Sequence, residues 1–255
     1  MNRVKAAFFS LTPPPPADDD GSYLRWHLLD HMPEQYQLPG IVHAARWIAD
    51  GDYPGHRIAG HGPLTDVGGV VNYLVGEPVQ QTHHEFLELG GRLAERGRFP
   101  QVRPSLQLTM PALLGWHAAP RALVSAEVVP FRPHRGVVVV VEEPAGGDVD
   151  AWLRWLHVEH TPAVLAVTGV AGLWMYGSTD TWRLDPRAQH GRQFVTVFYL
   201  DGPPLATARA LTPLLEQRWA SGAARPLFAG PLRSMLQWDA WPADAHDDEE
   251  LEHRS

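Results

Sequence analysis

The sequence predicts an α+β protein made of two tandem ferredoxin-like repeats, each with the element order β-α-β-β-α-β. The stretch YLRWHLLDHMPEQYQLPG, residues 23–40, aligns without a gap with WLRWLHVEHTPAVLAVTG, residues 152–169. Two further matches keep the same order along the chain: residues 3–11 with 135–143, and residues 70–78 with 196–204. Three matches in one order indicate an internal duplication, because a single short match could arise by chance.

The matched positions include aromatic, charged and turn-forming residues. A carboxylate precedes the matched histidine in both copies, as Asp30 and Glu159. The pairs 129 residues apart are Trp26 with Trp155, His31 with His160, Pro33 with Pro162 and Gly40 with Gly169; the pairs 126 apart are Tyr73 with Tyr199 and Gly76 with Gly202. The drift of three residues is what a loop of different length produces in a duplicated domain.

Each copy opens with a strand and a helix. The apolar runs at 4–11 and 136–142 are typical of buried strands, and turn-rich segments follow them. Ser22 and Asp148 are suitable N-caps for the helices that come next. Pro33 and Pro162 should bend these helices or end their first part.

The remaining elements follow in the same order in both copies. We expect second strands at 41–49 and 170–178, third strands at 68–75 and 193–200, and second helices at 82–97 and 205–221. The fourth strands are expected at 122–131 and 231–241. The segment 100–121 has no counterpart in the second copy and is expected to be an insert that covers a pocket mouth.

These elements define an N-terminal repeat over 1–134, a C-terminal repeat over 135–242 and an acidic tail, 243–255, that is expected to be disordered. A ferredoxin-like sheet carries helices on one face, so its other face needs a partner. The sheet of the second copy can supply it within one chain. We therefore expect a monomer closed by its own two sheets, or a homodimer.

Composition narrows the functional classes. The chain has no cysteine, which excludes disulfides, thiolate nucleophiles and cysteine-ligated metals and fits a cytoplasmic location. The formal charge is -8 with no basic stripe, so nucleic acid is not an expected partner. No apolar window is long enough to cross a membrane, and the apolar start of the chain is typical of a strand and not of a leader.

The stretch YLRWHLLDHMPEQYQLPGIVHAARW and its second copy resemble the dimeric α/β barrel superfamily. The match is best with the EthD-like branch, in which a W…EH.P….VPG…RR signature runs from the first helix to the second strand. Thr168 and Met175 depart from that pattern, where Pro39 and Arg46 stand in the first copy. The resemblance implies a barrel formed by the two sheets of one chain. It leaves the reaction open among isomerases, cyclases, cofactor-free oxygenases and haem-handling proteins.

His31 is the leading catalytic candidate, because imidazole can exchange a proton near neutral pH. Its recurrence as His160 favours the alternative, a role in capping or bracing the proline-containing helix. Asp30 is not expected to orient His31, since adjacent helical side chains point in different directions. His27 shares a helix face with His31, but neither this pair nor the His83-His84-Glu85 cluster has a recognised metal signature, and no metal is expected.

Other candidates lie on the strands. His43 and Arg46 are three apart on the second strand and should face opposite sides; Arg46 is suited to a carboxylate or enolate, or to a surface ion pair. Tyr73 and Tyr199 could donate to an oxyanion or fill the core. Trp26 and Trp47 are flat apolar walls for a ligand, or core residues. The predicted catalytic residues are thus His31, His43 and Arg46, and the predicted binding residues are His27, Trp26, Trp47, Tyr73, His160 and Tyr199.

The function expected from these residues is that of a small-molecule enzyme without a bound organic cofactor. It would transfer protons on an apolar cyclic or polyketide-like substrate as an isomerase, cyclase or lyase. One alternative is a cofactor-free monooxygenase acting on an aromatic substrate. Others are a haem- or ligand-binding protein without catalysis and a purely structural module. His27, His43 and Arg46 occur only in the first copy and favour the N-terminal cleft.

Overall fold

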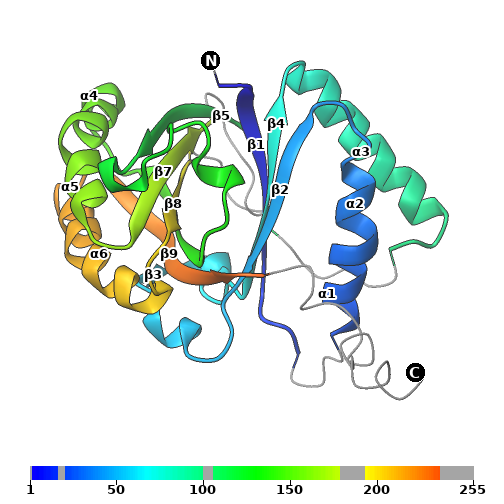
Figure 1. The fold of residues 1–255 in the computed structure, drawn as a ribbon, viewed down its shortest axis with the longest axis horizontal. Helices are drawn as coiled ribbons and strands as arrows, with labels where there is room; N and C mark the ends of the chain where they lie inside the picture. The colour runs from blue at the N-terminus through cyan, green and yellow to red at the C-terminus, as the bar shows by residue number, and fades with distance from the viewer. Residues whose placement is uncertain (1, 17–20, 100–105, 179–192, 236–255) are drawn as a thin grey trace, which may run out of the picture.

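The computed structural model describes residues 2–16, 21–99, 106–178 and 193–235. The expected tail, 243–255, and the end of the last expected strand lie outside these residues. The described chain is α+β, with one large antiparallel sheet and few helices (Figure 1). None of its helices is long or apolar enough to cross a membrane.

The described residues of the N-terminal half form five strands and three helices. Its strands are β1 (Val4–Thr12), β2 (Ile41–Ile48), the short β3 (Ala59–Gly60), β4 (Gly69–Gly76) and β5 (Leu106–Ala118). Its helices are α1 (Ser22–Trp26), α2 (Met32–Gln35) and α3 (Val79–Glu95). Short 3-10 turns occupy Tyr53–His56, Gly62–Leu64, Pro120–Ala122 and Val129–Phe131.

In the C-terminal half, the part of the chain that the structure describes forms four strands and three helices. Its strands are β6 (Gly136–Pro144), β7 (Val170–Gly177), β8 (Phe194–Leu200) and β9 (Ala224–Ser234). Its helices are α4 (Val149–Trp155), α5 (Thr161–Ala166) and α6 (Pro204–Ala220). The Asp148 side chain accepts from the backbone N–H groups of Asp150 and Ala151, so the predicted cap is confirmed, whereas α1 begins without a side-chain cap.

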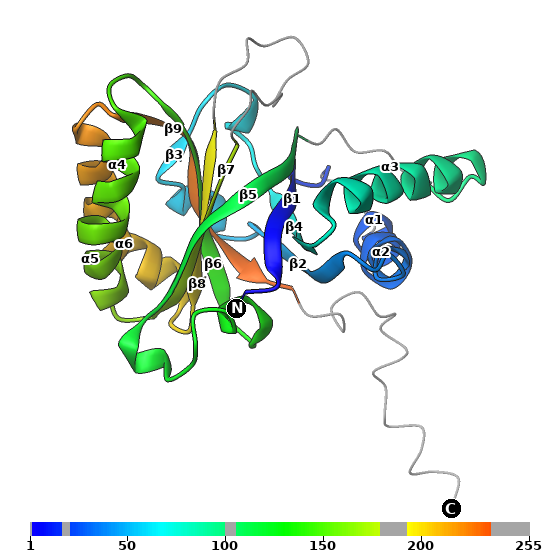
Figure 2. The same ribbon diagram turned by 90° about the horizontal axis from the view of Figure 1, so that it is seen from above.

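The strand order of the sheet is β2-β4-β1-β5-β7-β8-β6-β9-β3, and every pairing is antiparallel. β2 also pairs with β9 through two residue pairs, Trp47 with Ser234 and Ile48 with Arg233. The sheet thus closes on itself, with β3 attached outside the closed set. Figure 2 shows α1–α3 and α4–α6 on opposite sides, with the strands between them.

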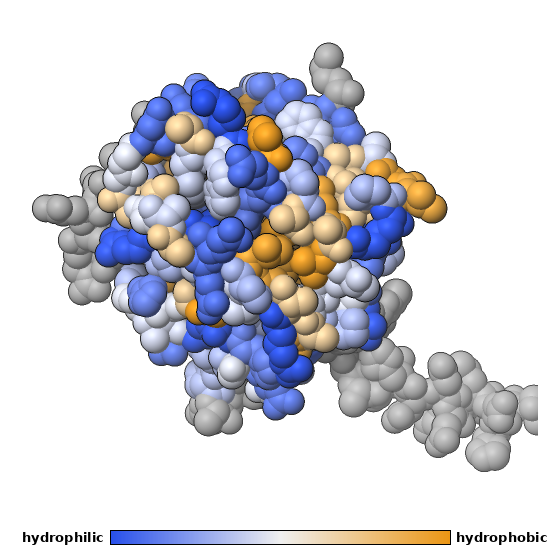
Figure 3. All heavy atoms as spheres, turned by 90° about the vertical axis from the view of Figure 1, so that its left-hand side faces the viewer, coloured by the Kyte–Doolittle hydropathy of each residue, from blue (hydrophilic) through white to orange (hydrophobic). Residues whose placement is uncertain are grey.

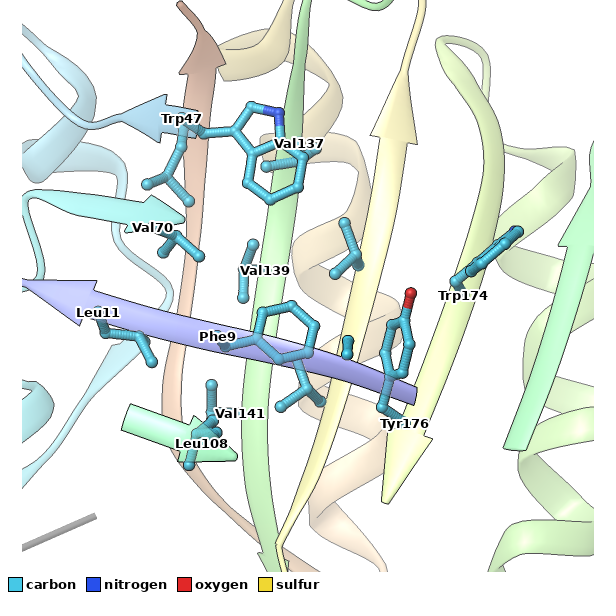
Figure 4. Packing of buried hydrophobic residues seen from close by; sticks show 14 of the residues in the cluster. Phe9, Leu11, Trp47, Val70, Leu108, Val137, Val139, Val141, Trp174 and Tyr176 are labelled. Atoms are coloured by element: carbon cyan, nitrogen blue, oxygen red, sulfur yellow. The ribbon is translucent and has the colours of Figure 1, made fainter. Parts of the chain in front are cut away.

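The inner face of the closed sheet holds the largest apolar core. Side chains of β1, such as Phe9 and Leu11, pack across Val137, Val139 and Val141 of β6 (Figure 4). Two smaller cores lie between the sheet and the helices, one in each half. This arrangement explains why strands such as VVVVV are apolar on both faces: one face meets the inner core and the other meets helices.

The fourth strand of the N-terminal half differs from its prediction. β5 lies within the segment 100–121 that was expected to be an insert, and 122–131 forms 3-10 turns instead of a strand. Pro111 argues against a strand in the sequence, but the β1–β5 register shifts between the pairs Ala6–Ala112 and Phe8–Thr109. Proline is tolerated at such an irregularity because a ladder hydrogen bond is already missing there.

The first helix of each half is interrupted by one π-helical turn, over His27–His31 and over Leu156–His160. The backbone N–H of Met32 bonds to the carbonyl of His27, five residues earlier, and Thr161 repeats this with Leu156. Pro33 and Pro162 follow directly. The wider turn makes room for the proline ring, which would otherwise clash with a preceding carbonyl, and the helix continues past it.

Gly40 and Gly169, matched in the sequence, have a common steric cause. A Cβ at Gly40 would lie 1.8 Å from the Thr82 hydroxyl oxygen, and one at Gly169 would lie 2.5 Å from that of Thr207. Each threonine lies in the first turn of the following long helix, so glycine lets that helix approach the start of the second strand.

The outer surface is more hydrophilic than the interior. Figure 3 views the side that carries α4–α6 and shows mostly hydrophilic residues around a smaller hydrophobic patch. Exposed large apolar side chains of the described chain include Leu123, Val158 and Leu87.

Candidate functional site

A cavity of about 230 Å³ lies between the sheet and the helices of the N-terminal half. Strands β1 and β4 supply its floor through residues such as Phe8 and Tyr73, and the first helix and α3 supply its walls. The polar lining includes Ser10, His27, His31, Gln35, Tyr73 and Gln107. We refer to this space as the N-terminal cleft.

Aromatic rings make up most of the apolar lining of the N-terminal cleft. On one side Phe8, Tyr73 and Phe86 form a cluster with ring centroids 4.9–6.2 Å apart. On the other side Trp26 and Phe99 meet edge to face at 5.3 Å. Two such ring clusters across a cavity fit a flat apolar ligand.

The π turn explains how Trp26 reaches His31. Residues five apart in an α-helix point about 140° from each other, but the additional residue in the turn brings them onto one side. The Trp26 and His31 rings stack with centroids 4.9 Å apart and planes at 21°. Trp155 and His160 repeat this arrangement at 5.3 Å and 30°. The stack is therefore a feature of both halves and not of the cleft alone.

Several polar groups of the N-terminal cleft are buried without a hydrogen-bond partner among the described residues. They are Nδ1 of His27, Nδ1 of His31, both amide atoms of Gln35 and the hydroxyl of Tyr73. The Gln35 side chain is 1% exposed and that of Tyr73 is 2% exposed. Each such group costs about 1–3 kcal/mol of stability, so their convergence on one cavity indicates a site for a ligand that would pair with them.

The ionisation of these groups follows from burial. Burial, followed by the charges of Arg46 and His31, holds the pKa of His27 well below its usual value. Burial lowers the pKa of His31 to about 4, although Asp30 and Glu34 oppose the shift. Burial also raises the pKa of the Tyr73 phenol far above its usual value, against the charge of Arg46. At neutral pH the cleft therefore presents two neutral imidazoles and a protonated phenol.

Arg46 is the cation beside these groups. It is 4% exposed, and its guanidinium lies 5.1 Å from the centroid of the Tyr23 ring, which lines the cleft. Its influence on the pKa values of His27 and Tyr73 agrees with this position. A positive charge at one end of a neutral cleft would stabilise negative charge that develops on a bound ligand.

Among the described residues, no hydrogen bond or ion pair joins Asp30 to His31. Asp30 and Glu34 instead form ion pairs with the guanidinium of Arg98, in the segment that follows α3. The carbonyl of Arg98 accepts a hydrogen bond of 3.0 Å from Nε1 of Trp26. Three contacts thus hold the residue next to Phe99 against the first helix.

Some predicted site residues lie outside the N-terminal cleft. His43, Arg46 and Trp47 line a second cavity, of about 320 Å³, and the His43 ring lies 5.3 Å from that of Phe131. Trp47 points to the inner core and donates a 2.8 Å hydrogen bond from Nε1 to Nε2 of His134. His43 does not line the N-terminal cleft with His31, so a joint role of these two histidines is without support from the cavity, and the catalytic role of His43 stays a prediction.

The pairing of Tyr73 with Tyr199 also needs correction. Tyr73 packs under the helices of the N-terminal half, whereas Tyr199 lies in the inner core against Trp47 and His134. The sequence match is offset by a residue on this strand, and a shift of one residue exchanges the two faces. Tyr199 therefore lines no cleft equivalent to that of Tyr73.

The C-terminal half has apolar side chains at the corresponding positions. Leu156 and Val164 occupy the positions of His27 and Gln35, and both are buried in the core of that half. Trp152 takes the position of Tyr23 and Met175 that of Arg46. His160 is 5% exposed beside this core, and its Nε2 is buried without a hydrogen-bond partner among the described residues, so its role in substrate binding stays a prediction.

Beside that core lies a buried ion pair. Arg218 and Glu142, each about 1% exposed, are bonded to one another, and Thr196 and Trp219 bond to the pair. This pair belongs to the packing of the C-terminal half and has no counterpart in the N-terminal cleft.

Sequence reasoning missed Gln35, Phe8, Phe86 and Phe99. Gln35 could have been found, because it stands opposite Val164 in the same alignment that singles out His27 opposite Leu156. The phenylalanines carry no local signal, since they reach the cleft from a strand, a helix and a connecting segment far apart in sequence.

The described residues contain no group of three or more histidine, aspartate or glutamate side chains placed to hold a metal ion. The cavity volume lies below the range of about 300–1,000 Å³ that is usual for ligand and cofactor sites. Haem is one of the larger cofactors, and the N-terminal cleft, at about 230 Å³, is too small for it. The residues that line this cleft therefore do not fit haem.

Known proteins of similar structure share the fold of this chain, at sequence identities too low to indicate its function. No family model and no curated protein match the chain. A chlorite dismutase-like protein of known structure is 12% identical over 93% of this chain and 98% of its own, with a TM-score of 0.57. An anthrone oxidase-like protein is 11% identical over 92% and 93%, with a TM-score of 0.55. A chlorite dismutase variant from Candidatus Nitrospira defluvii, solved with cyanide, is 15% identical over 94% of each chain, with a TM-score of 0.53.

Proposed function

We propose that the chain is a small-molecule enzyme that works without a bound organic cofactor, and that the N-terminal cleft is its one active site. The observation that carries this proposal is the convergence of His27, His31, Gln35 and Tyr73, all with unpartnered buried atoms, on one aromatic-walled cavity. In the other half Leu156 and Val164 take the positions of His27 and Gln35 and are buried in an apolar core, which favours one site over two.

We further propose that the chain is a tandem-duplicated, EthD-like member of the dimeric α/β barrel superfamily. The repeated element order, the two matched π turns and the pairing of β5 with β7 and of β2 with β9 support a barrel formed within one chain. The likeness over nearly the whole length of the structural neighbours agrees with this origin.

In the proposed reaction His31 takes a proton from the ligand and returns it elsewhere. Its imidazole is neutral at neutral pH and can accept a proton; the pKa of about 4 makes it a weak base in the empty cleft and a strong donor once it is protonated. The Tyr73 hydroxyl donates to the oxygen that becomes negative, and the nearby charge of Arg46 stabilises that oxygen. Isomerisation, cyclisation or elimination on an apolar cyclic ligand needs no more than this.

Oxidation of an aromatic ligand is the second candidate. The specific observation in its favour is the pair of aromatic clusters around the cavity, together with a structural neighbour named as anthrone oxidase-like. Proton removal by His31 would be the first step in either reaction, and consumption of dissolved oxygen by the purified chain with its ligand separates the two.

The test begins with the ligand itself. The purified chain is extracted with organic solvent and the extract is analysed by mass spectrometry, beside a double variant, His27→Leu with Gln35→Val. This variant gives the N-terminal cleft the residues that fill the other half, so it should fold and lose the ligand. Equal recovery of every compound from both proteins would contradict a site in this cleft.

Turnover of the recovered ligand then tests His31. His31→Ala should abolish it, and His160→Ala is the matched control, because it removes the same Trp–His stack from the half in which apolar residues take the positions of His27 and Gln35. Both variants should keep a native circular dichroism spectrum. Bound but unchanged ligand in the unaltered chain would favour the binding-only alternative, and a Soret band after haem reconstitution would favour haem.

A further inference from the structure

Phe99 forms part of the cleft wall without belonging to the sheet or to a helix of the fold. Its ring lies 4.9 Å from that of His31 and 5.3 Å from that of Trp26, edge to face in both cases. It therefore covers the imidazole that the proposed function assigns to proton transfer. The other ring residues of the cleft are carried by strands or helices.

The backbone brings Phe99 to this place through a short turn. Helix α3 ends at Glu95, and Gly97 follows with φ of 68°, in the left-handed region that ends many helices. The N–H of Arg98 bonds to the carbonyl of Leu93 at 2.9 Å. These bonds fix where the segment leaves α3 but not how it lies against the first helix.

The side chain and carbonyl of Arg98 supply that second attachment. The guanidinium bridges Asp30 and Glu34, which lie four residues apart across the end of the π turn. The carbonyl accepts the hydrogen bond from Trp26, the same ring that stacks on His31. Arg98, Asp30 and Glu34 are all partly exposed, so these ion pairs are weak and sensitive to salt.

We propose that Phe99 is a removable wall of the N-terminal cleft and that Arg98 is its positioning residue. We call the contacts of Arg98 with Asp30, Glu34 and Trp26 the Arg98 clamp. This clamp controls the access of a flat apolar ligand to His31. The inference rests on the proposed function of the cleft, because it assigns a use to the space that Phe99 covers. When the clamp releases, the ring leaves His31 and the cleft opens; when the clamp closes, the ring excludes water from the imidazole.

The asymmetry between the halves supports a functional role. The His160–Trp155 stack of the C-terminal half lies beside a filled apolar core, and Glu159, the match of Asp30, has no ion pair recorded among the described residues. A contact that only braced the helix would be equally useful in both halves. The ion pairs of Arg98 with Asp30 and Glu34 lie in the half that has the N-terminal cleft.

The experiment measures how fast diethyl pyrocarbonate modifies each histidine, by mass spectrometry of peptides, on the full chain without any ligand. Arg98→Ala should speed modification of His31 about threefold, as expected for loss of two exposed ion pairs. Phe99→Ala should speed it more. His160 is the internal reference and should not change in either variant.

Arg225→Ala is the matched control, since it removes another exposed ion pair, to Glu143, far from the cleft. An unchanged His31 rate in Arg98→Ala, or a rise equal to that in Arg225→Ala, would overturn the role of Arg98. An unchanged rate in Phe99→Ala would overturn the role of Phe99. If Arg98→Ala fails to fold, the unaltered chain is compared at about 0.05 M and about 1 M salt; the proposal requires faster His31 modification at high salt.

The rate of His31 modification is measured without a ligand, so it does not depend on whether the chain is an enzyme. A clamp that opens as described, in a chain that converts no ligand, would leave this inference standing and remove the proposed function. A catalytic cleft with a constant His31 rate would do the reverse.

Discussion

His160 should make the stability of the chain depend on pH. It is 5% exposed, and burial, with a smaller contribution from the charge of Arg218, lowers its pKa to about 3. An unfolded histidine titrates near 6.5. Between these values the unfolded chain binds a proton that the folded chain does not, so the free energy of unfolding falls as the pH drops below about 6.5.

The magnitude follows from the two pKa values. At pH 5 the unfolded histidine is almost fully protonated and the folded one is neutral, which lowers the free energy of unfolding by about 2 kcal/mol relative to high pH. The loss would grow until the pH approaches the folded value near 3. Above pH 6.5 both states are neutral, and this contribution is fully present.

The assay is urea denaturation of the unaltered chain and of His160→Gln at pH 7 and pH 5, followed by tryptophan fluorescence. Other buried histidines make both proteins less stable at pH 5. The variant should lose about 2 kcal/mol less than the unaltered chain between the two pH values. His61→Gln, at an exposed position, is the control and should behave like the unaltered chain. An equal loss in His160→Gln would refute the reasoning.

Three further outcomes are expected in equilibrium denaturation at pH 7. Gln35→Val should raise the free energy of unfolding by about 1–2 kcal/mol, because it removes two unpartnered buried atoms; a lower stability would show that Gln35 is paired in the free chain. Gly115→Ala should lower the free energy of unfolding by about 1–3 kcal/mol, because the new Cβ would lie 2.3 Å from the His157 ring. Gly91→Ala is the control, since a Cβ there meets open space, and it should not lower the stability. Equal effects of the two substitutions would contradict this reasoning. Arg218→Met should cost about 3–5 kcal/mol by leaving Glu142 charged and buried, and adding Glu142→Leu should restore most of it; no recovery in the double variant would argue against the ion pair as the cause.

The order of the elements was predictable because it rests on strong local patterns. Runs such as VVVVV, the Asp148 cap and the period of the long helices all agree with the structure. β5 was not predictable, since Pro111 lies in the strand and the bulge that accommodates it depends on the partner β1. A register irregularity is set by two strands together and leaves no mark in either sequence alone.

The site could be predicted in part, for a different reason. His27 was found because comparison of the copies separates shared residues from unshared ones, and the same comparison contains Gln35. Tyr199 lies on the other face from Tyr73, because a match of letters across a strand does not fix the face on which they lie. Phe99 was out of reach, since its place depends on an ion pair between segments 64 and 68 residues apart.

The difference between the two clefts has a consequence for how such a protein can change. If two identical chains formed the closed sheet, every substitution would enter both clefts at once, and each buried polar group would weaken the assembly twice. In one chain, Leu156 and Val164 strengthen one side while His27 and Gln35 remain on the other. The apolar core of the C-terminal half therefore stabilises the whole chain. The N-terminal half can accept new polar residues, and new ligands, at half the loss of stability that the same substitutions would cause in a dimer of identical chains.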